Sequence, residues 1–430
     1  MLPTTTHRSS EELMQLEDRH GAHNYHPLPV VLTKGEGVFV WDVEGKRYYD
    51  FLSAYSALNQ GHCHPRLVEA LTEQASRLAL TSRAFYNDQL GPYEKFATQY
   101  FGYDKLLPMN SGAEAVETAI KLCRKWAYER KGIPNGEALI IICGQNFHGR
   151  TTTIISFSSD PDAKGHYGPY TPGFISIPYN DLGALRKALE ENSPRVAGFL
   201  VEPIQGEAGV VVPDEGFIPE AAAMCREHGV LFMADEIQTG IARTGSLLAV
   251  CGDCTCEGHC ERQPGAYTRP DVLILGKALS GGMYPVSAVL ADDPIMGVFK
   301  PGQHGSTFGG NPIASHVATV SLEVVREEKL AQNARRLGKI FRKRMQALAE
   351  RSELVKLVRG KGLLNAVVIN DKPESSTAWD ICVTLAENGL LAKPTHGNII
   401  RFAPPLVMTE EQLLECCDII EKTILEFRKS

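Results

Sequence analysis

Short apolar runs that alternate with helical patterns are the feature that most constrains the fold of this 430-residue chain. Continuous apolar runs of this length are typical of parallel strands that are covered on both faces. Amphipathic segments lie between some of them, at residues 181–190 and 219–228. The runs occupy residues 138–143, 198–201, 230–234, 271–275 and 285–290. The alternation predicts an α/β domain with a mainly parallel sheet.

The segments on either side of this domain have other patterns. Before it, residues 38–41 and 47–49 predict a small hairpin with a turn at Glu44 and Gly45. After it, residues 313–351 predict one or two helices, residues 354–370 and 389–401 short strands, and residues 409–428 a helix. We therefore expect an N-terminal arm with a hairpin (1–52), a large domain (53–310) and a smaller α+β domain (311–430).

Charge and hydropathy exclude several classes of function. The formal net charge of −7 argues against electrostatic binding to nucleic acid. No apolar run approaches the roughly 20 residues needed to span a bilayer. The first twenty residues carry Glu11, Glu12, Glu17 and Asp18 and lack the apolar core of a secretory signal. We expect a cytoplasmic protein that acts on small molecules.

Two predicted strands end in residues suited to chemistry. Residues 230–234 run into Asp235, and residues 271–275 run into Lys277. Ligands of doubly wound sheets bind at the carboxyl ends of such strands. A predicted helix begins near the same edge, where Ser111 and Glu114 have the spacing of a capping box. Its free N–H groups and positive dipole end are suited to a phosphate.

An amine, a carboxylate and a phosphate site at one sheet edge are what pyridoxal 5′-phosphate (PLP) chemistry requires. The lysine would hold the cofactor as a Schiff base, and the carboxylate would keep the ring nitrogen protonated so that the ring accepts electrons. The released lysine amine would then move a proton as a general base.

Longer motifs make this interpretation specific. They include Ser53-Ala-Tyr-Ser-Ala57, Asn59-Gln-Gly-His-Cys-His-Pro65, Val201-Glu-Pro-Ile-Gln-Gly-Glu-Ala-Gly209 and Leu275-Gly-Lys-Ala-Leu-Ser-Gly-Gly282. From Gly21 to about Phe427 the chain closely resembles the class III aminotransferases of PLP fold type I. Within that family it is most similar to the ornithine aminotransferases.

The resemblance implies a set of cofactor-binding residues. Lys277 matches the Schiff-base lysine, Asp235 the partner of the ring nitrogen, and Gln238 the neighbour of the ring hydroxyl. Phe147 matches the aromatic residue stacked on the ring. The backbone N–H groups of Gly112 and Ala113 match the family's phosphate contacts. Ser306 and Thr307 match a phosphate contact that the other subunit supplies, which implies a homodimer with a shared active site.

The resemblance also implies the substrates, ornithine and 2-oxoglutarate, and the residues that bind them. Arg150 matches the arginine that binds the carboxylate of ornithine, and Tyr25 and Tyr55 match its ornithine-recognising tyrosines. Arg401 matches the arginine for the α-carboxylate of glutamate, and Glu207 its switchable ion-pair partner. Alternatives are a sister enzyme that uses acetylornithine or 4-aminobutyrate, and a catalytically silent scaffold or redox sensor.

Two single residues and one insertion depart from the family pattern. His148 stands where a tryptophan is expected in animal members, and Leu58 where valine is usual. The larger departure is a cysteine-rich insertion at about residues 251–268, with Cys251, Cys254, Cys256 and Cys260 in a C-x2-C-x-C-x3-C pattern. Three interpretations stay open: a small metal site, with zinc as the metal that suits closely spaced thiolates, a redox loop with disulfides, and a tolerated insertion with reduced thiols.

Overall fold

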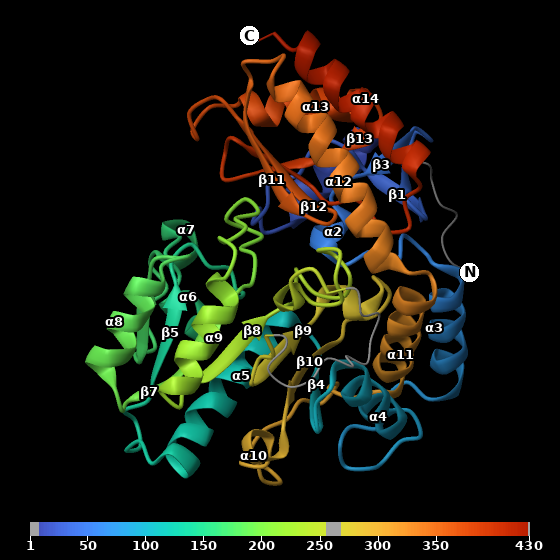
Figure 1. Ribbon diagram of the computed structural model, residues 1–430. Helices are drawn as coiled ribbons and strands as arrows, with labels where there is room; N and C mark the ends of the chain where they lie inside the picture. The colour runs from blue at the N-terminus through green and yellow to red at the C-terminus, as the bar shows by residue number, and fades with distance from the viewer. Residues whose placement is uncertain (1–7, 255–267, 429–430) are drawn as a thin grey trace.

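A seven-stranded sheet forms the centre of the large domain in the computed structural model, which describes residues 8–254 and 268–428 (Figure 1). The strand order is β4-β10-β9-β8-β7-β5-β6. The strands are β4 (Lys105–Met109), β5 (Leu139–Cys143), β6 (Phe174–Ile177), β7 (Val196–Val201), β8 (Leu231–Asp235), β9 (Val272–Leu275) and β10 (Ser287–Ala291). All neighbours from β9 to β6 pair in parallel, which confirms the mainly parallel sheet.

The direction of β10 differs from the expectation for residues 285–290. This strand pairs antiparallel with both β4 and β9. All of its residues are buried, as the apolar run predicted. An apolar run reports burial on both faces but contains no information about strand direction, so the parallel expectation was wrong here.

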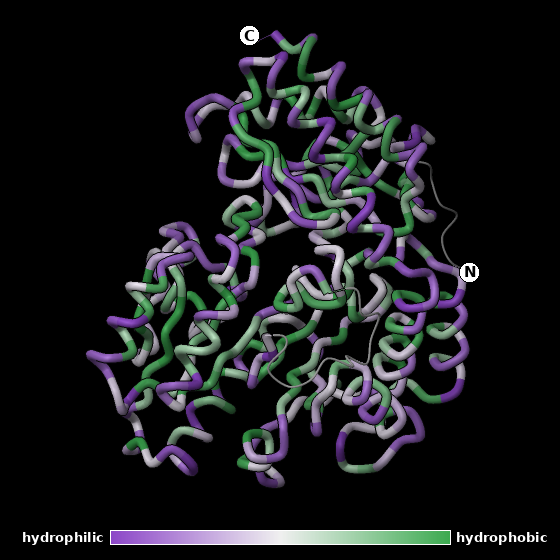
Figure 2. Tube along the Cα trace, in the orientation of Figure 1, coloured by the Kyte–Doolittle hydropathy of each residue, from purple (hydrophilic) through white to green (hydrophobic). Residues whose placement is uncertain are grey.

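Helices cover both faces of the sheet. Every residue of β7, β8 and β9 is buried, so these strands form the centre of the apolar core, and the apolar residues of the trace concentrate there (Figure 2). Helix α5 packs across β4, β7, β9 and β10. The helices of this part are α5 (Gly112–Trp126) with the π turn η1 (Ala127–Lys131), α6 (Thr152–Ser156), α7 (Pro161–Lys164), α8 (Leu182–Asn192), α9 (Phe217–Glu227) and α10 (Asp293–Met296).

The C-terminal part contains an antiparallel sheet of order β11-β12-β15-β14 with helices packed on it. Residues 313–351 form two helices, which break where Lys329 adopts a left-handed φ of 53°. The elements are α11 (Pro312–Glu327), α12 (Leu330–Ala349), β11 (Val355–Lys361), β12 (Leu364–Ile369), α13 (Thr377–Glu387), β13 (Leu390–Leu391), β14 (Lys393–Thr395), β15 (Ile399–Phe402) and α14 (Glu410–Glu426).

The N-terminal part forms a third sheet. The predicted hairpin is present as β2 and β3, and β1 adds an exposed strand that the sequence reasoning missed. The fourth strand is β13, which pairs in parallel with β3, so this sheet joins both ends of the chain. The elements are α1 (Ser10–His20), β1 (Leu32–Glu36), β2 (Phe39–Asp42), β3 (Arg47–Asp50), α2 (Ser53–Ser56), α3 (Pro65–Arg77) and α4 (Leu90–Phe101).

Helix α11 packs against both α3 and α4 at the flank of the large sheet (Figure 1). The domain limits at residues 52 and 310 remain predictions. None of the helices in the described ranges is long and apolar enough to cross a membrane.

Candidate active site

A cavity of about 200 Å³ lies at the edge of the large sheet where β8 and β9 end. Six of the predicted cofactor residues line it: Gly112, Ala113, Phe147, Asp235, Gln238 and Lys277. They come from four separate segments of the chain. The sheet therefore brings the predicted amine, carboxylate and phosphate site together around one space.

Lys277 is the first residue of η3 (Lys277–Ser280), directly after β9 and Gly276. Its φ of 43° is left-handed, which is unfavourable for a residue with a side chain and is tolerated where the surrounding structure fixes the turn. Burial lowers the pKa of its amine, although the negative charges of Glu207 and Asp235 oppose the effect. A lowered pKa increases the neutral, nucleophilic fraction of the amine.

Asp235 is the last residue of β8, and only 4% of it is exposed. Its Oδ1 accepts a hydrogen bond from the backbone N–H of Ile237 at 3.0 Å. Its Oδ2 lies 2.6 Å from Nδ1 of His148. These contacts hold a carboxylate at the wall of the cavity, facing the space that Lys277 also lines.

The N-terminus of α5 forms another wall of the cavity. The predicted capping box is present: the Ser111 hydroxyl accepts from the N–H of Glu114, and the Glu114 carboxylate accepts from the N–H of Ser111 at 2.7 Å. The N–H groups of Gly112 and Ala113 belong to the first helical turn and have no intrahelical acceptor. They form an anion site that favours a phosphate.

Ser306 and Thr307 do not line this cavity. The Ser306 hydroxyl accepts from Nδ2 of Asn110 at 2.7 Å, and Thr307 is exposed. Ser306 thus contacts the segment directly before α5, but neither residue is part of the cavity lining of a single chain.

Glu207 and Arg401 form an ion pair beside the cavity. Nη1 of Arg401, on β15, lies 2.7 Å from Oε1 of Glu207, and the arginine side chain is only 3% exposed. Gln238 contacts both partners, at 2.9 Å from Glu207 and 3.2 Å from Arg401. Burial is the largest influence on the pKa of Glu207 and acts to raise it, but the charge of Arg401 and the hydrogen bonds from Arg401 and Gln238 together outweigh burial and lower the pKa. The pair is therefore ionised, and it occupies the face of Arg401 that would otherwise bind a carboxylate.

Tyr55 approaches this pair from an unusual turn. In α2 (Ser53–Ser56), four consecutive residues have φ values between 46° and 72°, so the segment is left-handed. L-residues pay roughly 1–2 kcal/mol each for that conformation. The turn places the Tyr55 ring under the guanidinium of Arg401, with 4.8 Å between the guanidinium carbon and the ring centroid.

The two other predicted substrate residues lie further out. Tyr25 is 72% exposed and, with Tyr55, lines a neighbouring cavity of about 540 Å³. Arg150 is exposed, and its guanidinium carbon lies 5.9 Å from the centroid of the Phe147 ring. Tyr25 and Arg150 are thus exposed, whereas Arg401 is buried.

Two titratable residues of the cavity lining, Glu202 and His148, were not predicted as site residues. Glu202 follows β7, and its Oε2 accepts from the N–H of Phe147 at 3.0 Å. Burial raises the pKa of Glu202 to about 7. His148 contacts Asp235, although the two residues are 87 positions apart. Glu202 belongs to the motif of residues 201–209 that carries the family resemblance, so the sequence offered a reason to place it at the site. No local pattern in the sequence linked His148 to Asp235.

The cysteine-rich insertion is only partly described. Cys251 is half-buried and Cys254 is buried, whereas Cys256 and Cys260 lie outside the described residues. Among residues 8–254 and 268–428, no group of three or more histidine, cysteine or acidic residues could hold a metal ion. The three interpretations of this loop therefore stay open.

The cavity fits PLP by the chemistry of its walls. The amine of Lys277 makes no hydrogen bond or ion pair with any described residue, so it is available for a carbonyl group. A side chain at Gly149, whose φ is 131°, would place its Cβ 2.9 Å from the Cβ of Ala113 and narrow the cavity at the helix end. An aldehyde partner, an acid for a ring nitrogen and a phosphate site are thus present together.

Comparison with known proteins agrees with this geometry. The family model for class-III aminotransferases matches residues 20–424. The chain is 58% identical to a Drosophila melanogaster protein named as a mitochondrial ornithine aminotransferase, over 97% of this chain and 92% of that one.

Solved structures give the same fold. A crystal structure of an acetylornithine aminotransferase from Elizabethkingia anophelis is 65% identical, with a TM-score of 0.89 over 98% of this chain and 100% of that chain. A structure of the Toxoplasma gondii ornithine aminotransferase is 47% identical, with a TM-score of 0.92 over 98% of this chain and 95% of that one.

The fold and the site therefore define an enzyme of PLP fold type I. The chain belongs to the class-III aminotransferases, and its cofactor is pyridoxal 5′-phosphate.

Proposed function

We propose that this enzyme is an ornithine δ-aminotransferase, which converts L-ornithine and 2-oxoglutarate to L-glutamate 5-semialdehyde and L-glutamate. The observation that carries the proposal is the buried Glu207–Arg401 pair beside the cavity that Lys277 lines. Relatives named ornithine aminotransferases in fly, fission yeast and rat, at 55–58% identity, support the same substrate.

The ion pair accounts for the choice between two amines of one substrate. An open Arg401 would bind the α-carboxylate of ornithine in a bidentate manner and bring the α-amine to the reaction centre. Glu207 blocks that mode. Ornithine then binds by its carboxylate at Arg150, with Tyr25 and Tyr55 beside its chain, and presents the δ-amine. For glutamate and 2-oxoglutarate, Glu207 moves aside and Arg401 binds the α-carboxylate.

The remaining residues act on the reacting atoms. When bound, the cofactor supplies an electron sink for the carbon that loses a proton. Asp235 would hold the proton on the ring nitrogen, Gln238 would hold the ring hydroxyl, and Phe147 would pack against the ring. Gly112 and Ala113 would bind the phosphate through their N–H groups. The amine of Lys277 would carry the cofactor and, once released, would move the substrate proton.

A second candidate substrate is N-acetylornithine, because the 65%-identical Elizabethkingia anophelis structure is named for that activity. Acetylation removes the basicity of the α-nitrogen, so the δ-amine is the only amine that can react. A substrate with one reactive amine does not need a masked Arg401 to select it. The Glu207–Arg401 pair and Tyr55 therefore favour free ornithine.

A substrate panel tests the proposal. We expect kcat/KM for ornithine to exceed that for N-acetylornithine and for 4-aminobutyrate by about 100-fold or more, the discrimination available to a site with well-placed polar contacts. The Lys277→Ala variant should lose turnover with every substrate. A higher kcat/KM for N-acetylornithine in the unmodified enzyme would replace ornithine with the second candidate.

We also propose a homodimer in which Ser306 and Thr307 bind the phosphate of the partner's cofactor. Mixing two inactive chains tests this sharing. Lys277→Ala and the double variant Ser306→Ala/Thr307→Ala should each be weak or inactive alone. Hybrid dimers contain one site with every native residue, so activity should return on co-refolding. No recovery in dimers shown to be hybrid would contradict the shared site.

A cytoplasmic location stays a prediction. The relatives from Drosophila melanogaster and Rattus norvegicus are named mitochondrial. Fractionation of the source cells, with the protein detected by antibody, would decide between the two locations.

A further inference from the structure

His148 and Asp235 form a pair that is buried at the wall of the cofactor cavity. Their side chains are 1% and 4% exposed, and Nδ1 of His148 lies 2.6 Å from Oδ2 of Asp235. An ionised carboxylate only accepts hydrogen bonds, so Nδ1 must carry the proton. The other ring nitrogen, Nε2, is buried and has no hydrogen-bond partner among the described residues.

The surroundings of His148 fix the position of its ring. The preceding residue is held because the N–H of Phe147 donates to Glu202. The ring itself lies 6.0 Å from the ring of Phe157, centroid to centroid. Because the His148 side chain is only 1% exposed, its ring has little room to move, and Nδ1 can set the orientation of the Asp235 carboxylate.

We propose that His148 is a positioning residue that fixes the orientation of the Asp235 carboxylate toward the ring nitrogen of pyridoxal phosphate. This inference rests on the role proposed for Asp235. Two protein donors, the N–H of Ile237 and Nδ1 of His148, set the plane of the carboxylate. A buried carboxylate that lost one of these donors would rotate more freely.

A second carboxylate, that of Glu202, lies close to Asp235 and makes a hydrogen-bond donor at this wall more important. Glu202 lines the same cavity as Asp235, and two close carboxylates disfavour each other's ionised forms. Burial acts to lower the pKa of His148, but the hydrogen bond and the charges of Asp235 and Glu202 dominate and raise it. A protonated His148 would offset the charge of Asp235 in the absence of the cofactor.

Substitution of His148 by Asn, Gln or Phe separates the hydrogen bond made by Nδ1 from the packing of the ring. The amide nitrogen of Asn lies close to the position of Nδ1, that of Gln lies close to Nε2, and Phe supplies a ring without a donor. We expect His148→Phe and His148→Gln to raise the dissociation constant for pyridoxal phosphate by about 10- to 100-fold, the loss typical of a hydrogen bond to a charged group. His148→Asn should remain within about threefold of the unmodified enzyme.

A second readout reports the ring nitrogen directly. The enzyme reconstituted with ¹⁵N-labelled pyridoxal phosphate should show the NMR shift of a protonated ring nitrogen in the unmodified protein and in His148→Asn. In His148→Phe and His148→Gln the shift should move toward that of the unprotonated ring.

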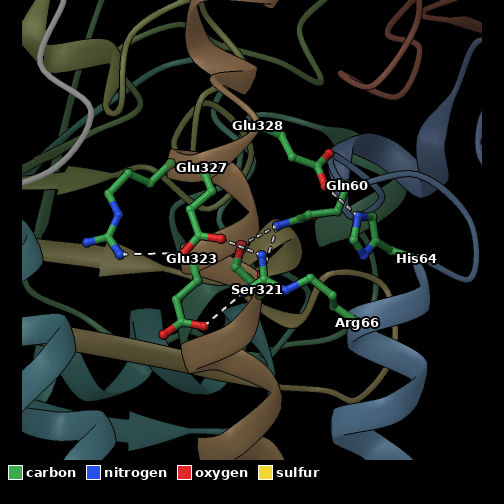
Figure 3. Close-up of polar contacts among 8 residues, drawn as sticks. Gln60, His64, Arg66, Ser321, Glu323, Glu327 and Glu328 are labelled. Carbon is green, nitrogen blue, oxygen red and sulfur yellow. Dashed lines mark hydrogen bonds and ion pairs between the residues drawn. The ribbon is translucent and has the colours of Figure 1, made fainter.

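A matched control comes from another histidine–carboxylate pair. His64 contacts Glu328 at 2.8 Å in a polar cluster between α3 and α11, where Arg66 also pairs with Glu323 and Glu327 (Figure 3). The His64 side chain is 12% exposed. His64→Gln should leave both the cofactor affinity and the ring-nitrogen shift unchanged.

The outcomes distinguish this inference from the role of Asp235. If Asp235→Asn leaves the ring-nitrogen shift unchanged, the role proposed for Asp235 is wrong. If Asp235→Asn changes the shift and neither His148→Phe nor His148→Gln does, only the inference about His148 is overturned. Equal dissociation constants and equal ring-nitrogen shifts in His148→Asn and His148→Gln would also overturn the inference about His148. This comparison can be made even if His148→Phe fails to fold.

Discussion

Two buried charges of the site have a partner in direct contact: Arg401 has Glu207, and Asp235 has His148. The amine of Lys277 makes no such pair among the described residues, although the negative charges of Glu207 and Asp235 act on it. Since an unpaired buried charge costs several kcal/mol, removing one partner should change the function of the other as well as the stability of the fold.

At the residue scale, Glu207→Gln should weaken the choice between the two amines of ornithine. The neutral amide keeps the shape of Glu207 but leaves Arg401 open to carboxylates. We expect KM for glutamate to fall by about tenfold and α-transamination products to appear from ornithine. Half-reaction kinetics and product analysis by mass spectrometry would measure both effects. Glu215→Gln, at an exposed position nearby, should change neither.

Arg243 is a buried cation held by neutral groups. It is fully buried, and its guanidinium donates to Oδ1 of Asn59 and to the carbonyls of Leu363 and Pro404. Burial lowers its pKa to about 9. These contacts join three distant segments of the chain, and Pro404 lies three residues after Arg401.

Arg243→Met should therefore lower the free energy of unfolding by about 2–4 kcal/mol, because three buried acceptors would lose their donor. Arg77→Ala, which removes an exposed ion pair with Asp88, should cost at most about 1 kcal/mol. Chemical denaturation of both variants measures the difference. Equal costs would show that the Arg243 contacts do not stabilise the fold.

At the element scale, the left-handed turn α2 stores strain at the residue before Tyr55. Ala54 has φ 46° and an exposed side chain, so Gly should fit there without loss of packing. Ala54→Gly should stabilise the protein by up to about 1 kcal/mol. Ala57 has φ −86°, so Ala57→Gly should instead destabilise by a similar amount. Thermal unfolding of the two variants should shift in opposite directions, and destabilisation by Ala54→Gly would show that the turn is not strained.

Helices and strands could be predicted where the sequence has a clear apolar run or a helix-capping pattern of its own. The apolar runs predicted β5, β7, β8 and β9, and the Ser111–Glu114 spacing predicted the start of α5. Strand β1 was missed because it is an exposed edge strand with Lys34 and Gly35 in it. Helix α1 was missed even though Ser9 and Glu12 form a capping box.

At the scale of the whole molecule, the sequence predicted six of the residues that line the cavity, but not all of their contacts. Strand ends can be placed at one edge from the order of elements, which brought Asp235 and Lys277 together. The His148–Asp235 contact depends on the packing of segments 87 positions apart, and no local pattern encodes it. The antiparallel direction of β10 depends on its neighbours in the same way.

Stability of the whole molecule should depend on pH through Glu236. Burial raises its pKa from 4.5 to about 7, although hydrogen bonds from Thr239 and Val250 oppose the effect. The unfolded chain therefore releases this proton at a lower pH than the folded protein does. The stabilisation is complete below about pH 4.5 and is lost as the pH rises to about 7.

Glu236→Gln should flatten this dependence, since the amide does not titrate. Denaturant unfolding measures the free energy of unfolding at about pH 5 and about pH 7.5. Its decrease between the two pH values should be smaller in the variant, by on the order of 2 kcal/mol. An equal decrease in both proteins would assign the pH dependence to other groups.

Reductive trapping tests the central claim, that Lys277 carries the cofactor, most directly. Borohydride treatment of the enzyme with bound pyridoxal phosphate, followed by peptide mass mapping, should place the whole label on Lys277 and none in Lys277→Ala. A label on any other lysine, or an unchanged label in the variant, would contradict the account.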